Sequence, residues 1–195
     1  MLLFDKIFHK DKNDQPEREK YTEQNAQAQD GKSFESSLGK FTYVYAPDSN
    51  PPEIGYESEL QWYDMPEDAR ERLKYFPVGC YIDCNTPDTM EAGICLDRLT
   101  RLFEDRVWTD RRVKQAAADH FAGENGMIKD RDGMDVSKEE FIEQLEITFI
   151  GLYRDGSTVY SVDHGCELDF DGEIHVTYDD ADQVTFQTEE DFYGG

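Results

Sequence analysis

The sequence predicts an α+β domain with an antiparallel C-terminal β-meander and helices packed on one face. Two observations carry this prediction. After Glu146 the chain alternates short β-type runs with turn signals, among them two Asp-Gly pairs. Strands joined by such short turns run antiparallel, because a parallel return needs about a dozen residues. Between Asp88 and Phe121 apolar residues recur at helical spacing, and amphipathic helices bury such a stripe against a sheet.

The first half of the chain contains three candidate strands and one short helix. The strands are expected at 41–45, 56–62 and 78–84, where aromatic or alternating apolar residues occur. Pro66 opens the short helix, since proline is tolerated in a first turn. The helix runs through Tyr75 and stops before Pro77.

Three more helices and five more strands complete the predicted fold. A helix over 88–105 has an inward stripe made of Ile94, Cys95, Leu99, Leu102 and Phe103. A second helix runs to about Phe121, with Thr109 or Asp110 as its cap. A capping box at 137–140 opens a short third helix. The candidate C-terminal strands are 146–153, 157–163, 166–170, 173–178 and 183–187.

The chain divides into an N-terminal segment and one folded domain. Residues 1–8 are amphipathic, and 9–36 contain almost no large apolar side chain. Such a stretch cannot bury enough surface to offset its ordering entropy. We therefore expect a short amphipathic segment plus flexible tether over 1–36 and a single α+β domain over 37–195. Residues 1–8 are either a docking peptide or a frayed terminus.

The chain is strongly acidic, with 44 acidic against 20 basic residues and a formal net charge of −24. Such a charge repels phosphate backbones and anionic lipids, so it excludes nucleic acid and membranes as partners and favours a basic protein. The stretch Glu146–Gly195 has 13 acids and one base, whereas 97–114 has six bases and four acids. We expect an acidic sheet region and a mildly basic helical region.

The sequence indicates a cytoplasmic protein. Asp5 and Lys6 interrupt the apolar start, so no signal-peptide core is present, and no apolar run approaches the roughly 20 residues that span a bilayer. Cys80 and Cys84 lie in one candidate strand, about 13 Å apart, which is too far for a mutual disulfide. We expect them to be small buried thiols in a reducing compartment.

The stretch from Asp130 to Phe141 looks like a calcium-binding EF-hand loop with its exiting helix, but the spacing fails. If Asp130 is loop position 1, Glu140 is position 11 instead of 12, and Asp135 stands where glycine is required. The other register places Lys129 at the first ligand position. An acidic loop leading into a capped helix explains the same residues.

No motif supports catalysis or a resident cofactor. The chain has no nucleophile elbow, P-loop or dinucleotide fingerprint. His164, Cys166 and His175 could meet across a hairpin, but zinc-type ligand spacing is missing, so turn residues and a buried thiol are the better interpretation. A glycosidase-like cleft could be assembled from Glu57, Glu59 and Trp62, which we interpret as ordinary strand residues. The sequence therefore assigns no catalytic residue, no cofactor and no metal.

Short motifs along the chain suggest a family. They lie at 38–43, at 55–57 with Trp62, and at 116–121, 137–141, 155–157 and 169–176. Together they resemble a bacterial domain-of-unknown-function family of small acidic α+β proteins, over residues 38–187. The resemblance implies no established activity and an association with toxin-neutralising or accessory binding proteins. One departure is that Glu173 and Ile174 separate Gly172 from His175, where the family places the histidine directly after the glycine.

The sequence thus favours a protein-binding module that covers a basic partner with its acidic sheet surface, as an immunity protein covers a toxin. The candidate contact residues are Asp169, Asp171, Glu173, Asp179, Asp180 and Asp182. Two alternatives stay open. A carboxylate- or metal-dependent hydrolase requires a deep pocket with convergent carboxylates, at least one with a perturbed pKa. A structural scaffold subunit requires a stable oligomer.

Overall fold

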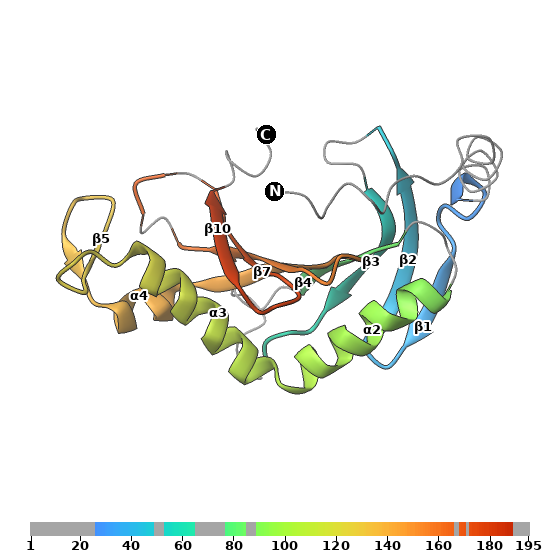
Figure 1. The fold of residues 1–195 in the computed structure, drawn as a ribbon, viewed down its shortest axis with the longest axis horizontal. Coiled ribbons are helices and arrows are strands. Elements are labelled where there is room, and N and C mark those ends of the chain that lie inside the picture. The colour runs from blue at the N-terminus through green and yellow to red at the C-terminus, as the bar shows by residue number, and fades with distance from the viewer. Residues whose placement is uncertain are drawn as a thin grey trace, which may run out of the picture.

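The fold was obtained as a computed structural model, which describes residues 26–48, 53–64, 77–84, 89–165, 168–170 and 172–188. Its main feature is an eight-stranded sheet with the order β1-β2-β3-β4-β7-β8-β9-β10 (Figure 1). These strands are β1 (Ser33–Ser36), β2 (Gly39–Ala46), β3 (Glu53–Leu60), β4 (Val78–Asp83), β7 (Glu146–Leu152), β8 (Thr158–Asp163), β9 (Ile174–Tyr178) and β10 (Val184–Thr188). The helices are α2 (Thr89–Glu104), α3 (Arg106–Phe121) and α4 (Lys138–Gln144), and a small hairpin pairs β5 (Ile128–Lys129) with β6 (Asp135–Val136). The predicted α+β class is confirmed.

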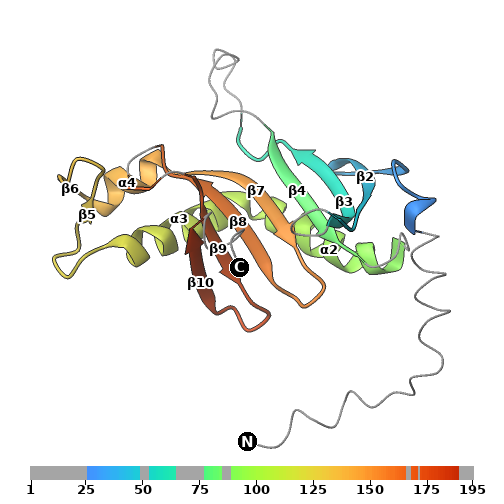
Figure 2. The ribbon, with the colours of Figure 1, turned by 90° about the horizontal axis from the view of Figure 1, so that it is seen from above.

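The large sheet consists of two antiparallel halves joined at one parallel pair. Strands β1 to β4 pair antiparallel in chain order, and so do β7 to β10. Only β4 and β7 run parallel. A parallel return requires a long crossover, which here contains both long helices, the small hairpin and α4. Figure 2 shows α2 and α3 crossing the width of the sheet, one after the other.

The hydrophobic core lies between the sheet and the long helices. Figure 1 shows α2 and α3 on the same side of the sheet, with α2 beneath the N-terminal half and α3 beneath the C-terminal half. Phe41 and Tyr43 of β2 are fully buried while Thr42 between them is partly exposed, the alternation expected of a strand with one face on a core. The helices contribute Leu99 and Ala117, both fully buried.

The cysteines of the described strands are buried thiols, as predicted. Cys80 and Cys84 are free, buried and part of the core. Burial raises the pKa of the Cys80 thiol far above its ordinary value, because the thiolate would lose its hydration. Cys80 is therefore a packing residue. Cys166 lies outside the described residues.

The folded domain begins earlier than residue 37, so the predicted tether over 1–36 is wrong in its last part. Ser33–Ser36 form β1, which pairs with β2 in register from Ser33–Thr42 to Ser36–Gly39. Most residues of this stretch are polar, but the Phe34 ring anchors it by stacking on Phe41 with centroids 5.4 Å apart. Ala26 is also buried in the core. The predicted amphipathic segment at 1–8 lies outside the described residues.

Helix α3 begins at Arg106, before both predicted caps. Asp105 precedes it without a side-chain cap hydrogen bond, and Thr109 is a buried residue inside the helix. Only Asp105 separates the two long helices, so Thr109 lies inside α3 and does not stand at its N-terminus as a cap. The predicted short helix at 66–75 lies outside the described residues. None of the helices within the described ranges has the length and hydropathy needed to cross a membrane.

One predicted C-terminal strand, 166–170, is not a strand where the structure describes it. Residues 168–170 form a bend, and Gly165 has a φ of +60°. The Leu168 N–H donates to His164 Nδ1 at 3.4 Å, which curls this connection onto itself instead of extending it. The other four predicted strands coincide with β7, β8, β9 and β10, with ends that differ by one residue.

The acidic stretch from residue 130 is a turn followed by a capped helix, the alternative that the sequence offered beside the EF-hand interpretation. Asp130 Oδ1 accepts the N–H groups of Asp132 and Met134 at 3.0 and 2.7 Å, so this carboxylate closes its own turn. Ser137 and Glu140 form both hydrogen bonds of the predicted capping box at the start of α4. In the part of the chain that the structure describes, no group of three or more His, Cys, Asp or Glu side chains could hold a metal ion.

Candidate functional site

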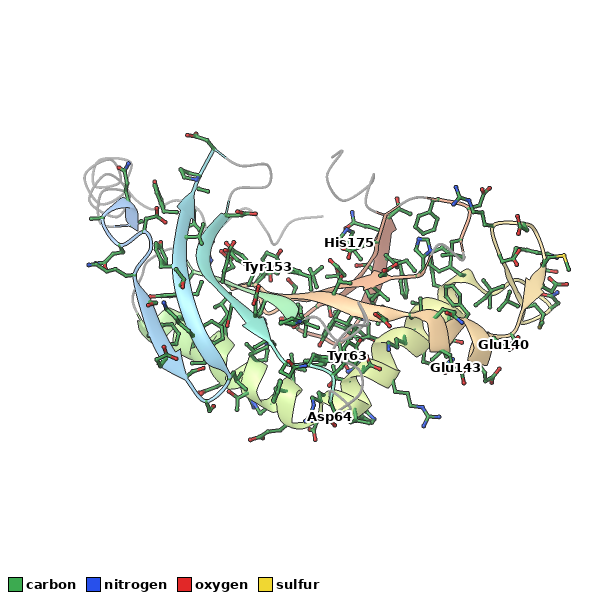
Figure 3. The ribbon with its side chains drawn as sticks, turned by 180° about the vertical axis from the view of Figure 1, so that it is seen from behind. Tyr63, Asp64, Glu140, Glu143, Tyr153 and His175 are labelled. Atoms are coloured by element: carbon green, nitrogen blue, oxygen red, sulfur yellow. The ribbon has the colours of Figure 1, made fainter. Side chains whose placement is uncertain are left out.

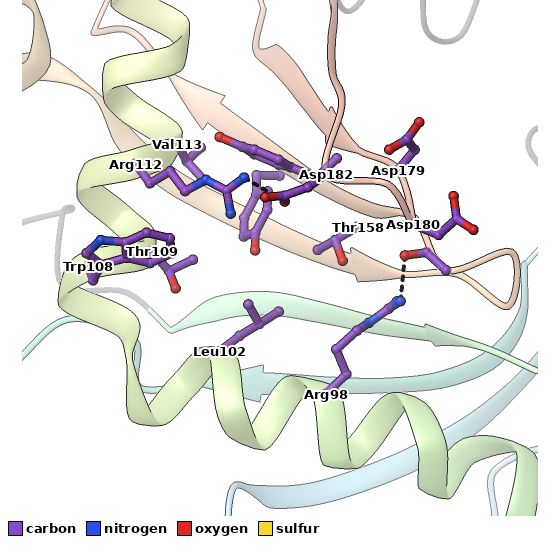
Figure 4. A pocket seen from close by; sticks show the side chains of 13 residues that line it. Arg98, Leu102, Trp108, Thr109, Arg112, Val113, Thr158, Asp179, Asp180 and Asp182 are labelled. Carbon is purple, nitrogen blue, oxygen red and sulfur yellow. Dashed lines mark hydrogen bonds and ion pairs between the residues drawn. The ribbon is translucent and has the colours of Figure 1, made fainter.

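A pocket of about 340 Å³ lies where the two long helices meet the turns at one end of the C-terminal strands (Figure 4). The residues from the helices are Arg98 and Leu102 of α2 and Trp108, Thr109, Arg112 and Val113 of α3. The residues from the sheet and its turns are Gly156, Thr158, Tyr160, Tyr178, Asp179, Asp180 and Asp182. Three of the predicted partner-contact residues therefore line one pocket, and its volume lies within the range of ligand sites.

The turn between β9 and β10, residues 179–183, forms the outer wall of this pocket. Its first N–H donates to the carbonyl of the fifth residue, and its fourth N–H donates to the carbonyl of the first. The same two bonds close the turns at 123–127, 130–134 and 153–157. In those three turns the fourth residue is glycine with positive φ, whereas here it is Asp182 with φ 66°. A carboxylate thus stands at a position whose backbone conformation favours glycine.

The Asp182 carboxylate faces Arg112 of α3. Asp182 Oδ1 lies 2.6 Å from Arg112 Nη2. The guanidinium also lies over two rings, 4.3 Å from the centroid of Tyr178 and 5.3 Å from that of Trp108. Burial lowers the pKa of Arg112, but the hydrogen bond with Asp182 and the electrostatic attraction of nearby acidic groups together outweigh it, so the net pKa is raised. Arg112 is therefore a fixed cation in the pocket wall, with its charge matched by Asp182.

Arg98 of α2 ties that helix to the turn between β7 and β8. Its Nη1 donates to the carbonyl of Gly156 at 2.6 Å, and its Nη2 donates to the carbonyls of Ser157 at 2.8 Å and Tyr153 at 3.3 Å. All three acceptors belong to one turn. A guanidinium that donates to several carbonyls is held in one orientation, so Arg98 fixes the pocket floor relative to α2.

Two buried hydroxyls in the pocket wall have no hydrogen-bond partner. Thr109 is 3% exposed and Tyr178 is 7% exposed, and neither Thr109 Oγ1 nor Tyr178 Oη is hydrogen-bonded. Burial raises the pKa of Tyr178, so its phenol carries a proton at neutral pH. A buried polar group without a partner costs about 1–3 kcal/mol.

The pocket rim is exposed and carries an indole at one end and carboxylates at the other (Figure 4). The Trp108 side chain is 62% exposed, and Asp179 and Asp180 are exposed as well. Asp179 Oδ1 accepts the N–H groups of Ala181 and Gln183 at 2.9 and 2.7 Å, so it stabilises its own turn. Asp180 forms no ion pair with any basic side chain of the described ranges. An exposed tryptophan at such a rim is typical of binding hot spots.

The other predicted contact residues lie at the opposite end of β9. Asp169 and Glu173 precede this strand and the aspartates of the β9–β10 turn follow it, which separates the two groups by about 20 Å along the strand. Asp169 is exposed, whereas Glu173 accepts a hydrogen bond from Thr148 Oγ1. Asp171 lies outside the described residues. The predicted contact residues that the structure describes therefore form two separate groups, and only the group at the β9–β10 turn lines the pocket.

The candidate glycosidase residues are not brought together. Glu57 and Glu59 line an open depression on β3, whereas Trp62 is buried against the Phe103 ring, with centroids 6.1 Å apart. Burial raises the pKa of Glu57, and the neighbouring Glu53 raises it further. The carboxylates and the indole thus lie in different environments, as expected for ordinary strand residues.

The histidines of the sheet region and of α3 are engaged in packing at different places. Figure 3 shows His175 on the side of the sheet that faces away from α2 and α3. The contacts are His175 Nδ1 with Ser161 Oγ at 3.0 Å, His164 with the Phe170 ring at 4.8 Å, and His120 stacked on the Phe186 ring at 4.2 Å. They give no convergent ligand set within the described residues.

Sequence reasoning missed the helical half of the pocket. Trp108 and Arg112 are four residues apart on one helix, a spacing that places them on one face and could have indicated the site. Comparison of the chain with protein-family models, curated proteins and solved structures finds no match. The resemblance to a bacterial family therefore stays a prediction, and the function has to be argued from the site.

Proposed function

We propose that the chain is a protein-binding module that recognises a basic partner at the rim formed by Trp108, Asp179 and Asp180. The observation that carries this proposal is the exposed Trp108 at the mouth of a pocket rimmed by carboxylates, in a chain with a net charge of −24. Tryptophan supplies a large contact area with little entropy loss, and carboxylates select a basic surface.

The rim rests on a rigid base, which favours specific recognition over a general attraction. The β7–β10 meander, with helices on one face, provides the frame. One arginine of each long helix binds a turn of this meander. Arg98 holds the β7–β8 turn through three carbonyls, and Arg112 holds the β9–β10 turn through Asp182. Because both turns are fixed to helices, the rim needs little reorganisation on binding.

The charge of the partner follows from the charge of this chain. A field of many carboxylates accelerates the association of a basic protein and repels acidic ones, an effect that salt screens. Binding should therefore weaken when the salt concentration rises from about 0.1 M to 0.5 M, because the Debye length falls below about 5 Å. The contact with Trp108 is apolar and should persist at high salt.

Affinity capture from a lysate of the source organism, followed by reconstitution with the purified captured protein, tests the proposal. Trp108→Ala should weaken binding at least tenfold in calorimetry, since a central tryptophan is worth about 2 kcal/mol or more. Ile94→Ala is the matched control, because Ile94 is 75% exposed on α2 and does not line the pocket. A partner that is acidic, or one that binds Trp108→Ala and wild type equally, overturns the proposal.

A further inference from the structure

We propose that the free edge of β10, the side of this strand away from β9, binds an extended segment of the partner as an additional strand. The segment has basic residues at both of its ends. This inference rests on the proposed function and adds the form in which the basic partner is bound. The strand order of the sheet ends at β10, and Figure 2 shows it as the outermost strand on its side.

Every second residue of β10 presents its backbone polar groups to the free edge. The β9–β10 turn closes on a hydrogen-bonded pair, because the N–H of its first residue donates to the carbonyl of its fifth. Hydrogen-bonded and non-hydrogen-bonded pairs alternate along an antiparallel ladder. Thr185 and Gln187 therefore bond to β9, whereas the N–H and C=O groups of Val184 and Phe186 point away from it. No strand among the described residues pairs with these outward groups.

Strand β10 lacks the features that normally protect a sheet edge. Residues 183–188 contain no charged residue and no proline, in a chain of which 33% of the residues are charged. The strand pairs with β9 in continuous register over all of its five residues, so no bulge interrupts it. The opposite edge strand, β1, has four residues and includes the charged Glu35. Because short strands, charges, prolines and bulges are what prevent pairing at an edge, β10 is open to strand addition.

The edge is held in place by helix α3. The Phe186 ring stacks on His120 of this helix, with centroids 4.2 Å apart. Just before the strand, Asp182 Oδ1 lies 2.6 Å from Arg112 Nη2, also of α3. A strand fixed by side-chain contacts near its start and in its middle is already in the conformation that an added strand needs. Only the partner segment then has to lose conformational entropy on binding.

The charges beside β10 select a basic segment over a second copy of this chain. Acidic residues stand in sequence on both sides of the strand: Asp179, Asp180 and Asp182 before it, and Glu189, Glu190 and Asp191 after it. Five residues span about 17 Å, so a partner strand with basic residues about that far apart matches both ends. Antiparallel pairing of two copies would instead bring acidic ends together, which disfavours self-association.

The test is a titration of the full chain with the acetylated and amidated peptide KRTVTVTRK, followed by amide hydrogen exchange in NMR spectra. At saturation, exchange at Val184 and Phe186 should slow by about tenfold or more, because their N–H groups gain acceptors. Exchange at Thr185 and Gln187, which already bond to β9, should change little. Unchanged exchange at Val184 and Phe186 overturns the inference. It is also overturned if both amides are already protected in a free chain that light scattering shows to be a dimer.

A second peptide separates strand addition from general attraction. KRTPTPTRK has the same charge, but its prolines remove two backbone donors, so it should bind about tenfold more weakly. Equal affinity of the two peptides would mean that only charge acts, and the inference fails. The proposed function is judged by a different result, namely whether the captured partner binds Trp108→Ala and wild type equally.

Discussion

The turns at 130–134 and 179–183 share one backbone geometry but differ in the residue at their fourth position and in what it contacts. Each opens with an aspartate whose Oδ1 accepts the N–H groups of the third and fifth residues, at 3.0 and 2.7 Å for Asp130 and at 2.9 and 2.7 Å for Asp179. Their fourth residues have nearly the same φ, 77° and 66°. The local physics of the two turns is therefore the same.

The difference lies in the fourth residue, which is Gly133 in one turn and Asp182 in the other. Glycine adopts a positive φ freely, whereas an aspartate there costs about 1 kcal/mol. Nothing lies within 4 Å of a Cβ at Gly133, so no neighbouring element packs against that position. The Asp182 carboxylate instead reaches Arg112. The comparison shows that the β9–β10 turn accepts backbone strain and gains a contact to helix α3.

The largest effect is expected at the third turn of this kind, where Gly156 lies against the β9–β10 turn. A Cβ at Gly156 would lie 2.8 Å from Asp180 Cβ, and the φ of +93° adds strain. Gly156→Ala should therefore lower the free energy of unfolding by about 3 kcal/mol, the sum of strain and overpacking. Chemical denaturation measures the change. A loss below about 1 kcal/mol would show that the two turns are not in contact.

The second largest effect is expected when a carboxylate stands at the fourth position of the 130–134 turn, where no arginine pairs with it. Gly133→Asp gives the 130–134 turn the residue of the other turn, with no arginine to meet it. We expect a loss of about 1 kcal/mol in unfolding free energy, because the strain is added and the exposed Lys129, which donates to the Gly133 carbonyl, offers only a weak surface ion pair. Gly133→Asn is the control for charge, since asparagine tolerates a positive φ best. A stabilised Gly133→Asp variant would contradict the comparison.

The sequence could predict those parts of the fold and site that depend on neighbours along the chain. The capping box at 137–140 and the Asp-Gly turn at 155–156 follow from local hydrogen bonds and backbone preferences. The sequence could not predict that β4 and β7 pair in parallel, or that Arg98 binds a turn more than 50 residues away. These contacts depend on the crossover of the helices, which local patterns do not encode.

The arrangement of the site residues also depends on contacts between distant parts of the chain, so the sequence could not predict it. Charge alone predicts Asp179, Asp180 and Asp182 as contact residues, and it predicts Asp169 and Glu173 together with them. Charge does not tell which end of a strand a residue occupies, so one acidic surface was predicted where two groups exist. The role of Arg112 also depends on how α3 lies on the sheet.

The third effect concerns pH and the turn at 153–157. The Ser157 hydroxyl and N–H donate to Asp155 Oδ1 at 2.7 and 2.9 Å and hold the pKa of Asp155 below its ordinary value. Because the folded pKa is lowered, the contribution to stability is complete above the ordinary pKa of about 3.9 and is lost as the pH falls through the lowered value. Asp155 is exposed, so the contribution stays below about 1 kcal/mol.

Ser157→Ala removes one of these donors and should raise the pKa of Asp155 toward its ordinary value. An NMR titration of the Asp155 carboxyl carbon measures this shift directly. The turn at 130–134 serves as the reference, because Asp130 there accepts only backbone N–H groups. An unchanged titration of Asp155 in Ser157→Ala would show that the hydroxyl does not stabilise the carboxylate.

The smallest effect on stability is expected for Asp182→Gly, which gives the β9–β10 turn the glycine that the turns at 123–127, 130–134 and 153–157 have at their fourth position. Relief of the positive φ gains about 1 kcal/mol, and loss of a partly exposed ion pair costs a similar amount, so the two nearly cancel. The unfolding free energy should change by less than about 0.5 kcal/mol. A loss above about 1 kcal/mol would show that the ion pair of Asp182 with Arg112 outweighs the backbone strain, and a gain above about 1 kcal/mol would show that the ion pair does not compensate for it.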